Sequence, residues 1–140
     1  MDEDFDLIDI TLINMHLAVT RLSLASIHAA EGKVDAAITE YTKVLEFDPD
    51  IYLVYLNRGK LFWRKGEPQR AMDDLSRAIK LEPEVAQTYM CRGDISFKEG
   101  DLNSAREDYG KALELSPANE AVIKRLRRLR ERDKNDQDPG

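Results

Sequence analysis

Apolar and small side chains recur along this chain at a fixed interval. Pro49, Pro83 and Pro117 stand 34 residues apart, and each closes a stretch in which the same kinds of residue occupy the same places. Counting back from the proline, these are a hydrophobe, a small or β-branched residue, a large apolar or aromatic residue, an alanine and a glycine. Such a period predicts an array of repeats in which each unit buries its apolar face against its neighbours.

Within each period the hydrophobic positions follow the spacing of two α-helices. Tyr55, Gly59 and Phe62 fall on one stripe, and Ala71 and Leu75 begin a second one. Glycine at Gly66 and Gly100 suits a turn between the two helices because it adopts positive φ at little steric cost. Pro68 suits the first position of a second helix, and Asp101 suits an N-cap. The pattern therefore predicts an all-α protein built of antiparallel helical hairpins.

Two arginines and two aspartates repeat with the same period. Arg58 and Asp74 are 16 residues apart, and so are Arg92 and Asp108. On two antiparallel helices of one hairpin this separation brings the side chains together. We expect an ion pair within each hairpin, which fixes register more than it adds stability if it is exposed.

The two ends of the chain depart from the repeat. Val122, Ile123, Leu126 and Leu129 lie at helical spacing among charged residues, which predicts a capping helix over residues 120–132. Residues 133–140 lack hydrophobes and are expected to be disordered. Residues 1–17 form an acidic and apolar N-terminal extension, which either packs on the first repeat, lengthens its first helix, or is the remnant of an upstream unit.

Composition narrows the class of protein. The chain has 140 residues, 42% of them hydrophobic, and a net charge of -6. The longest uninterrupted apolar run, residues 51–56, is far shorter than a bilayer span, and an acidic start without Lys or Arg before Arg21 is unlike a signal peptide. Cys91 is the single cysteine, so no internal disulfide forms. We expect one soluble domain in the cytosol or nucleus, with no membrane segment.

These columns resemble the tetratricopeptide repeat. The segments YLNRGKLFWRKGEPQRAMDDLSRAIKLEP and YMCRGDISFKEGDLNSAREDYGKALELSP carry nearly every position of that family. The resemblance divides residues 18–119 into repeats 18–51, 52–85 and 86–119, of which the first is atypical because Arg21, Ala25, His28 and Val44 replace family residues. It implies a right-handed superhelical solenoid that binds another protein or a peptide on its concave face.

The family's groove-facing positions carry over to this sequence residue by residue. Trp63 and Phe97, one period apart, are expected to face the groove as apolar anchoring points, and basic residues are expected to form its rim. This arrangement suits a peptide with apolar anchors and acidic flanks. The candidate partner-binding residues are Leu22, Leu53, Leu56, Asn57, Lys60, Trp63, Arg64, Met90, Asp94, Phe97, Lys98, Lys124 and Arg128, with Val19, Ser26, Ala29 and Gln87 at further groove positions.

The best-known ligand mode of the family is a clamp of Lys, Asn and Arg for the acidic C-terminal tails of heat-shock chaperones. The resemblance places Leu22, Gln87 and Cys91 where the clamp has two lysines and an arginine, and Ser26 where it has an asparagine. Asn57 alone matches. The sequence therefore disfavours a co-chaperone of the carboxylate-clamp type.

Other functions find less support in the sequence. His16, His28 and Cys91 are isolated, and no phosphate-binding loop or metal-ligand cluster is present, so we expect no enzyme, cofactor or metal. The basic run KRLRRLR could contact nucleic acid or an anionic surface, but its leucines are needed to seal the third repeat. Salt-sensitive self-association, with the acidic N-terminus of one copy on the basic cap of another, is a further alternative.

Overall fold

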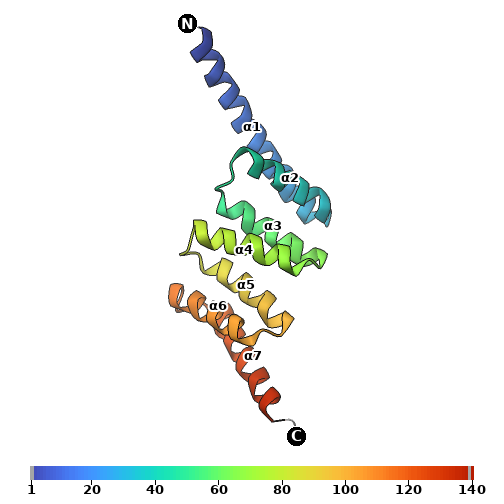
Figure 1. The fold of residues 1–140 in the computed structure, drawn as a ribbon, viewed down its shortest axis with the longest axis vertical. Coiled ribbons are helices and arrows are strands. Elements are labelled where there is room, and N and C mark those ends of the chain that lie inside the picture. The colour runs from blue at the N-terminus through green and yellow to red at the C-terminus, as the bar shows by residue number, and fades with distance from the viewer. Residues whose placement is uncertain (1, 139) are drawn as a thin grey trace.

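The computed structural model describes residues 2–138 and residue 140. Helices account for nearly all of this part of the chain, and they stack one beside the next into an elongated array with the two termini at opposite ends (Figure 1). In chain order they are α1 (Asp2–Ala30), α2 (Val34–Phe47), α3 (Tyr52–Lys65), α4 (Pro68–Leu81), α5 (Ala86–Glu99), α6 (Leu102–Leu115) and α7 (Glu120–Gln137). The prediction of an all-α solenoid of helical hairpins is confirmed.

Local chemistry sets where the helices begin and end. Gly66 and Gly100 have φ of 86° and 88°, in the left-handed region, and close α3 and α5. Pro68 is the first residue of α4, where its missing N–H costs no hydrogen bond. The Asp101 carboxylate caps α6 by accepting from the Ser104 N–H at 3.1 Å. The Ser104 hydroxyl also donates to it, and these bonds lower the pKa of Asp101.

Small residues hold the two helices of each hairpin together. Ala71 and Ala78 on α4 and Ala105 and Ala112 on α6 are fully buried. The partner helices approach them closely at Gly59 and Gly93. A Cβ built on Gly93 would lie 2.7 Å from Cε1 of Tyr109. The close packing therefore depends on the repeated glycines of the first helices and the repeated alanines of the second helices.

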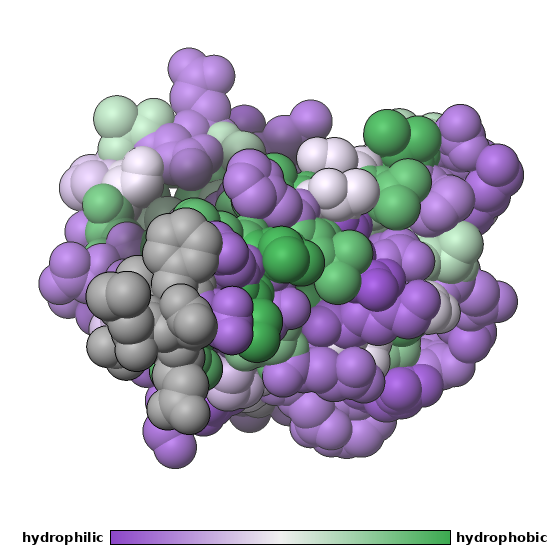
Figure 2. Space-filling model, turned by 90° about the horizontal axis from the view of Figure 1, so that it is seen from above, coloured by the Kyte–Doolittle hydropathy of each residue, from purple (hydrophilic) through white to green (hydrophobic). Residues whose placement is uncertain are grey.

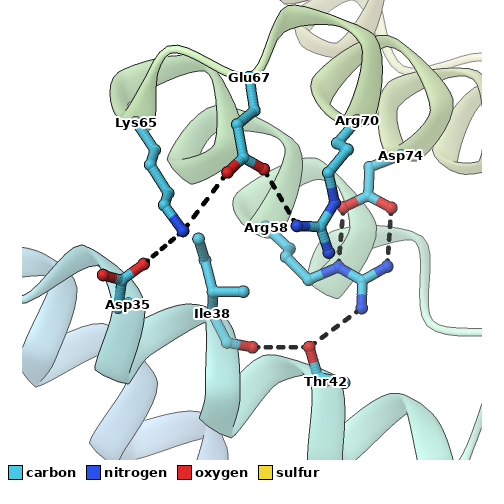
Figure 3. A network of polar contacts seen from close by, with 8 residues as sticks. All are labelled: Asp35, Ile38, Thr42, Arg58, Lys65, Glu67, Arg70 and Asp74. Atoms are coloured by element: carbon cyan, nitrogen blue, oxygen red, sulfur yellow. Dashed lines mark hydrogen bonds and ion pairs between the residues drawn. The ribbon is translucent and has the colours of Figure 1, made fainter.

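Buried ion pairs tie each hairpin to the one before it. The Arg58 guanidinium donates twice to the Asp74 carboxylate, at 2.8 Å each, and its third nitrogen donates to the Thr42 hydroxyl of the preceding repeat at 3.2 Å (Figure 3). Arg92 does the same with Asp108, and with Ser76 in the preceding repeat. The predicted intrarepeat pairs are confirmed.

The carboxylates of these pairs are buried in the array and are not solvated surface charges. Asp74 and Asp108 are buried, with 6% and 4% of their surface exposed. The hydrogen bonds to Asp74 outweigh desolvation and raise the pKa of Arg58, so the guanidinium stays charged. Figure 3 also shows an outer chain of contacts in which Lys65 lies between Asp35 and Glu67, so that repeats one and two share surface charges as well.

The last helix, α7, covers the open end of the third repeat. Its Val122 and Leu129 are buried in a cluster with Tyr89, Tyr109 and Ala112. The helix continues to Gln137, so the expected disorder from residue 133 is wrong for residues 133–137, and residue 139 lies outside the described residues.

Contacts with the third repeat account for this extra length. The Arg132 guanidinium donates to the Phe97 carbonyl at 2.8 Å, and Asp133 pairs with Arg106 of α6. Both contacts lie at or beyond the expected end of the cap.

The first helix, α1, runs without a break through the N-terminal extension into the first repeat. Its N-terminal half projects beyond the other helices (Figure 1). The segment Asp9–Ala30 is long and apolar enough to cross a membrane, judged by length and composition alone, with a mean hydropathy of 1.3. The expectation that the chain has no stretch of this kind is therefore wrong. It failed because scattered polar residues interrupt every contiguous apolar run in the segment.

Candidate peptide-binding groove

The first helices of successive repeats and the cap line one face of the array. Where α3, α5 and α7 meet, this face has an open hollow of about 390 Å³, which we call the cap pocket. Trp63 of α3 and Phe97 of α5 supply its aromatic surface, while α7 contributes basic side chains. The cap pocket is lined by Trp63, Asp94, Phe97, Lys98, Tyr109, Ala121, Lys124, Arg125 and Arg128.

The carboxylate in the cap pocket is already satisfied by the protein. Asp94 accepts a hydrogen bond from the Tyr109 hydroxyl at 2.7 Å, and two from Arg125 at 2.7 and 2.9 Å. Burial, followed by the bond to Asp94, raises the pKa of the Tyr109 phenol above its usual range. Asp94 therefore joins α5, α6 and α7, and its charge is offset by that of Arg125.

Three cationic side chains of the cap pocket have no ion-pair partner among the described residues. Within the residues that the structure describes, Lys98, Lys124 and Arg128 make no ion pair, and all three are exposed. The pocket thus combines two half-buried aromatic rings with uncompensated positive charge, which attracts a negatively charged ligand.

Phe97 is held in place by arginines of the cap. The guanidinium carbons of Arg128 and Arg132 lie 5.7 and 5.0 Å from the centre of its ring, within the range of cation–π attraction. Because Arg132 also donates to the backbone carbonyl of Phe97, the cap fixes both the ring and its backbone. The aromatic part of the pocket is therefore formed before any ligand arrives.

A second hollow lies nearer the N-terminus, between α1, α2 and α3. It is lined by Ser26, Ala29, Tyr41, Asn57, Lys60, Leu61 and Arg64. Lys60 and Arg64, which the sequence grouped with Trp63 in a single basic rim, thus face a different hollow. Arg64 also donates to the carbonyl of Ala29 at 3.4 Å. This face of the array therefore has two separate hollows at the predicted groove positions.

The expectation that Leu56 faces the groove is wrong. Only 1% of Leu56 is exposed, and it belongs to a core cluster with Phe62, Leu75 and Ile95. It fills the contact between the second and third repeats. Of the other predicted apolar positions, Leu53 is exposed, Leu22 packs partly against the first core cluster, and Met90 is half-buried.

Three pocket residues, Tyr109, Ala121 and Arg125, were not among the predicted ones. Tyr109 was assigned to the core because it occupies a repeating apolar column, yet its hydroxyl reaches the pocket through Asp94. Arg125 was counted only within a basic run. The hydrogen bonds from Arg125 to Asp94 are a tertiary contact, which the pattern of charges along the sequence does not reveal. Among the described residues no cluster of three or more His, Cys, Asp or Glu could hold a metal ion.

Comparison with known families agrees with this architecture. The TPR repeat model matches residues 25–66, and the tetratricopeptide repeat model matches residues 56–120. The chain therefore belongs to the tetratricopeptide-repeat family, whose domains are protein–protein interaction modules. A comparison with curated protein sequences gave no significant match.

Solved structures of similar fold are tetratricopeptide domains. The first TPR of Spaghetti (RPAP3), bound to the HSP90 peptide SRMEEVD, is 28% identical with a TM-score of 0.78, over 83% of this chain and 92% of that one. The second TPR domain of human RPAP3, in complex with the HSP70 peptide SGPTIEEVD, is 25% identical with a TM-score of 0.77, over 83% and 97%. The Arabidopsis OM64 TPR domain shares the fold at 22% identity and a TM-score of 0.80, over 85% and 98%.

Proposed function

We propose that this protein is an adaptor that captures an extended or helical peptide segment of another protein, with an apolar side chain seated between Trp63 and Phe97. Acidic residues beside that anchor would lie against Lys98, Lys124 and Arg128. The observation that carries the proposal is the cap pocket. Its carboxylate, Asp94, is bound by Arg125 and Tyr109, while Lys98, Lys124 and Arg128 have no ion-pair partner among the described residues. In such contacts a few buried apolar or aromatic side chains supply most of the binding free energy, and the polar groups around them add specificity.

The proposed ligand is not a chaperone tail held by a carboxylate clamp. Similar structures carry HSP90 and HSP70 peptides, but Leu22, Gln87 and Cys91 supply no cation at the clamp positions of this chain. Burial raises the pKa of the Cys91 thiol, which favours its neutral form. The positive charge in this chain is instead concentrated at the cap. We place the protein in the cytosol or nucleus on the basis of its single unpaired cysteine.

The proposal is tested with the fluorescence of Trp63, the single tryptophan of the chain. Synthetic peptides with one Leu or Phe beside several Asp or Glu residues are titrated into the protein, together with matched peptides in which Lys replaces each acid. We expect the acidic peptides to shift the emission of Trp63 and the basic ones to leave it unchanged. Added salt should weaken the effect, because the contacts lie at the surface.

A charge-matched pair of variants locates the site. Lys98→Glu with Lys124→Glu reverses the pocket charge at two exposed positions and should weaken acidic-peptide binding at least tenfold. Lys80→Glu with Lys134→Glu changes the net charge equally at exposed positions outside the pocket lining, and should bind as the original does. Equal binding by both variants, or no response to any acidic peptide, would overturn the proposal.

A further inference from the structure

The loop that joins α6 to α7 lies far from the apolar N-terminal end of the array. Hydrophobic side chains gather at that end, which Figure 2 shows from above, and α1 exposes Ile10 and Ile13 there. The loop before α7 is different in chemistry, because it carries Ser116 followed by Pro117. Ser116 is the only Ser or Thr of the chain that precedes a proline. Among the described residues it is also the only Ser or Thr that lies outside a helix.

The hydroxyl of Ser116 is not used by the fold. Ser116 is partly exposed and directly follows the last residue of α6, with φ of -141° and ψ of 77°, outside the helical region. The proline after it disfavours a helical backbone at this residue. The hydroxyl of Ser104 donates to Asp101 and that of Ser76 accepts from Arg92, whereas the Ser116 hydroxyl has no hydrogen-bond partner among the described residues. It is therefore free to react.

The first two repeats have an acidic residue where the third has Ser116. Asp48 and Glu82 precede the prolines that close those repeats. The Asp48 carboxylate accepts the backbone N–H of Asp50 at 3.0 Å. The equivalent N–H of the third repeat, that of Ala118, makes no hydrogen bond within the described part of the chain. An anion on Ser116 would thus meet a free donor, at a place that holds a carboxylate in the other two repeats.

The loop before α7 also lacks a contact that holds the two equivalent loops. The Tyr55 hydroxyl donates to the carbonyl of Pro49 at 2.8 Å, and the Tyr89 hydroxyl donates to that of Pro83 at 2.9 Å. One period later the same helical position is occupied by Ile123, which is 40% exposed and has no side-chain donor. Opening of this loop therefore breaks one hydrogen bond fewer than opening of either of the others.

We propose that Ser116 is phosphorylated by a proline-directed serine/threonine protein kinase. Such a kinase binds its substrate in an extended conformation, with proline directly after the acceptor. The Ser116 Oγ attacks the γ-phosphorus of ATP, the bond from that phosphorus to the β,γ-bridging oxygen breaks, ADP leaves, and the catalytic aspartate of the kinase accepts the hydroxyl proton. The acidic residues in the other two repeats favour a charged modification over a neutral one. The proposal is independent of the cap pocket, which neither Ser116 nor Pro117 lines.

Phosphate incorporation into the full chain tests the site. The folded protein is incubated with ATP and each of two proline-directed kinases, one cyclin-dependent and one mitogen-activated, and mass spectrometry locates the phosphate. We expect a single phosphate on Ser116, which Ser116→Ala and Pro117→Ala should both remove and the control Ser104→Ala should retain. A synthetic peptide of residues 110–124 reports whether each kinase accepts the sequence. A folded chain that gains no phosphate on Ser116 would overturn the proposal, most directly where the peptide is modified.

A second pair of variants tests why this loop is accessible. Ile123→Tyr supplies the hydroxyl that the other repeats have, and Ile123→Phe is the matched control with the ring alone. Ser116 should be phosphorylated about fivefold more slowly in the tyrosine variant, the effect of one ordinary hydrogen bond on local opening. Equal rates would refute the missing contact as the source of access. Circular dichroism of the phosphorylated chain should show undiminished helix content, and a loss would contradict an anion-tolerant place.

Discussion

At the residue scale, the closest contact between the two helices of a hairpin is made where one of them has no side chain. Gly93 faces the ring of Tyr109, and Gly59 faces Leu75 and the backbone of Ala71. Tyr109 in turn holds Asp94 and, through it, the cap. Adding one methyl group at Gly93 would therefore disturb both the core packing and the cap pocket.

Gly93→Ala should destabilise the protein. The new Cβ would lie 2.7 and 2.8 Å from two ring atoms of Tyr109, and overpacking of this kind costs about 1–3 kcal/mol. Gly110→Ala is the matched control, since nothing lies within 4 Å of its added Cβ and α6 should gain up to about 1 kcal/mol of helix propensity. Urea unfolding measures both. A Gly93→Ala variant as stable as Gly110→Ala would contradict the close packing.

At the scale of elements, the helical hairpins could be predicted because their signals are local. Gly66, Pro68 and Ala71 specify a turn, a helix start and a close contact within a few residues of one another. The length of α1 could not be predicted in this way, because its apolar residues lie on two sides and no glycine or proline interrupts the chain between Asp2 and Ala30. The end of α7 depends on contacts with Arg106 and Phe97, which lie far away in the sequence.

The start of α7 provides a test of how firmly the cap is held. The Asn119 side chain accepts hydrogen bonds from the N–H groups of Ala121 and Val122, at 3.0 and 3.4 Å. Asn119→Ala should remove this N-cap and lower the free energy of unfolding by about 1 kcal/mol. Asn135→Ala, at an exposed place in the same helix, should be neutral or slightly stabilising. Thermal unfolding followed by circular dichroism distinguishes the two, and equal shifts would argue against the cap.

The candidate groove was predictable in part for the same reason. The 34-residue period places Trp63 level with Phe97, and both line the cap pocket together with Lys98, Lys124 and Arg128. Leu56 was misplaced because neighbouring positions on a helix point about 100° apart, so a small error of rotation exchanges a groove position for an interrepeat one. The separation of the face into two hollows depends on how the helices pack against one another, which the period does not specify.

At the scale of the whole molecule, contacts are made almost entirely between neighbours in the sequence. Each hairpin packs on the next, and Arg58 and Arg92 connect successive repeats through Thr42 and Ser76. In such a chain of units the stability of one repeat depends on its own hairpin and on two interfaces. The second and third repeats each have both interfaces, whereas α1 with α2, and α7, each have one.

Amide hydrogen exchange should reveal this gradient. The slowest amides of α3, α4 and α5 should exchange more slowly than those of α2 and α7, because the end units can open without disrupting the centre. Mass spectrometry of peptides from each helix measures the difference. Equal protection throughout would mean that the array opens only as a single unit.

The cap that closes the third repeat also builds half of the pocket beside it. Lys124, Arg125 and Arg128 reach the pocket only while α7 is helical and docked. The folding of α7 and the capture of a ligand there are therefore thermodynamically linked, since a ligand that binds only the docked form shifts the equilibrium toward it. Fraying at this end would lower the apparent affinity by the fraction of time the helix is undocked. A modification that loosens α7 would thus regulate binding without touching Trp63 or Phe97.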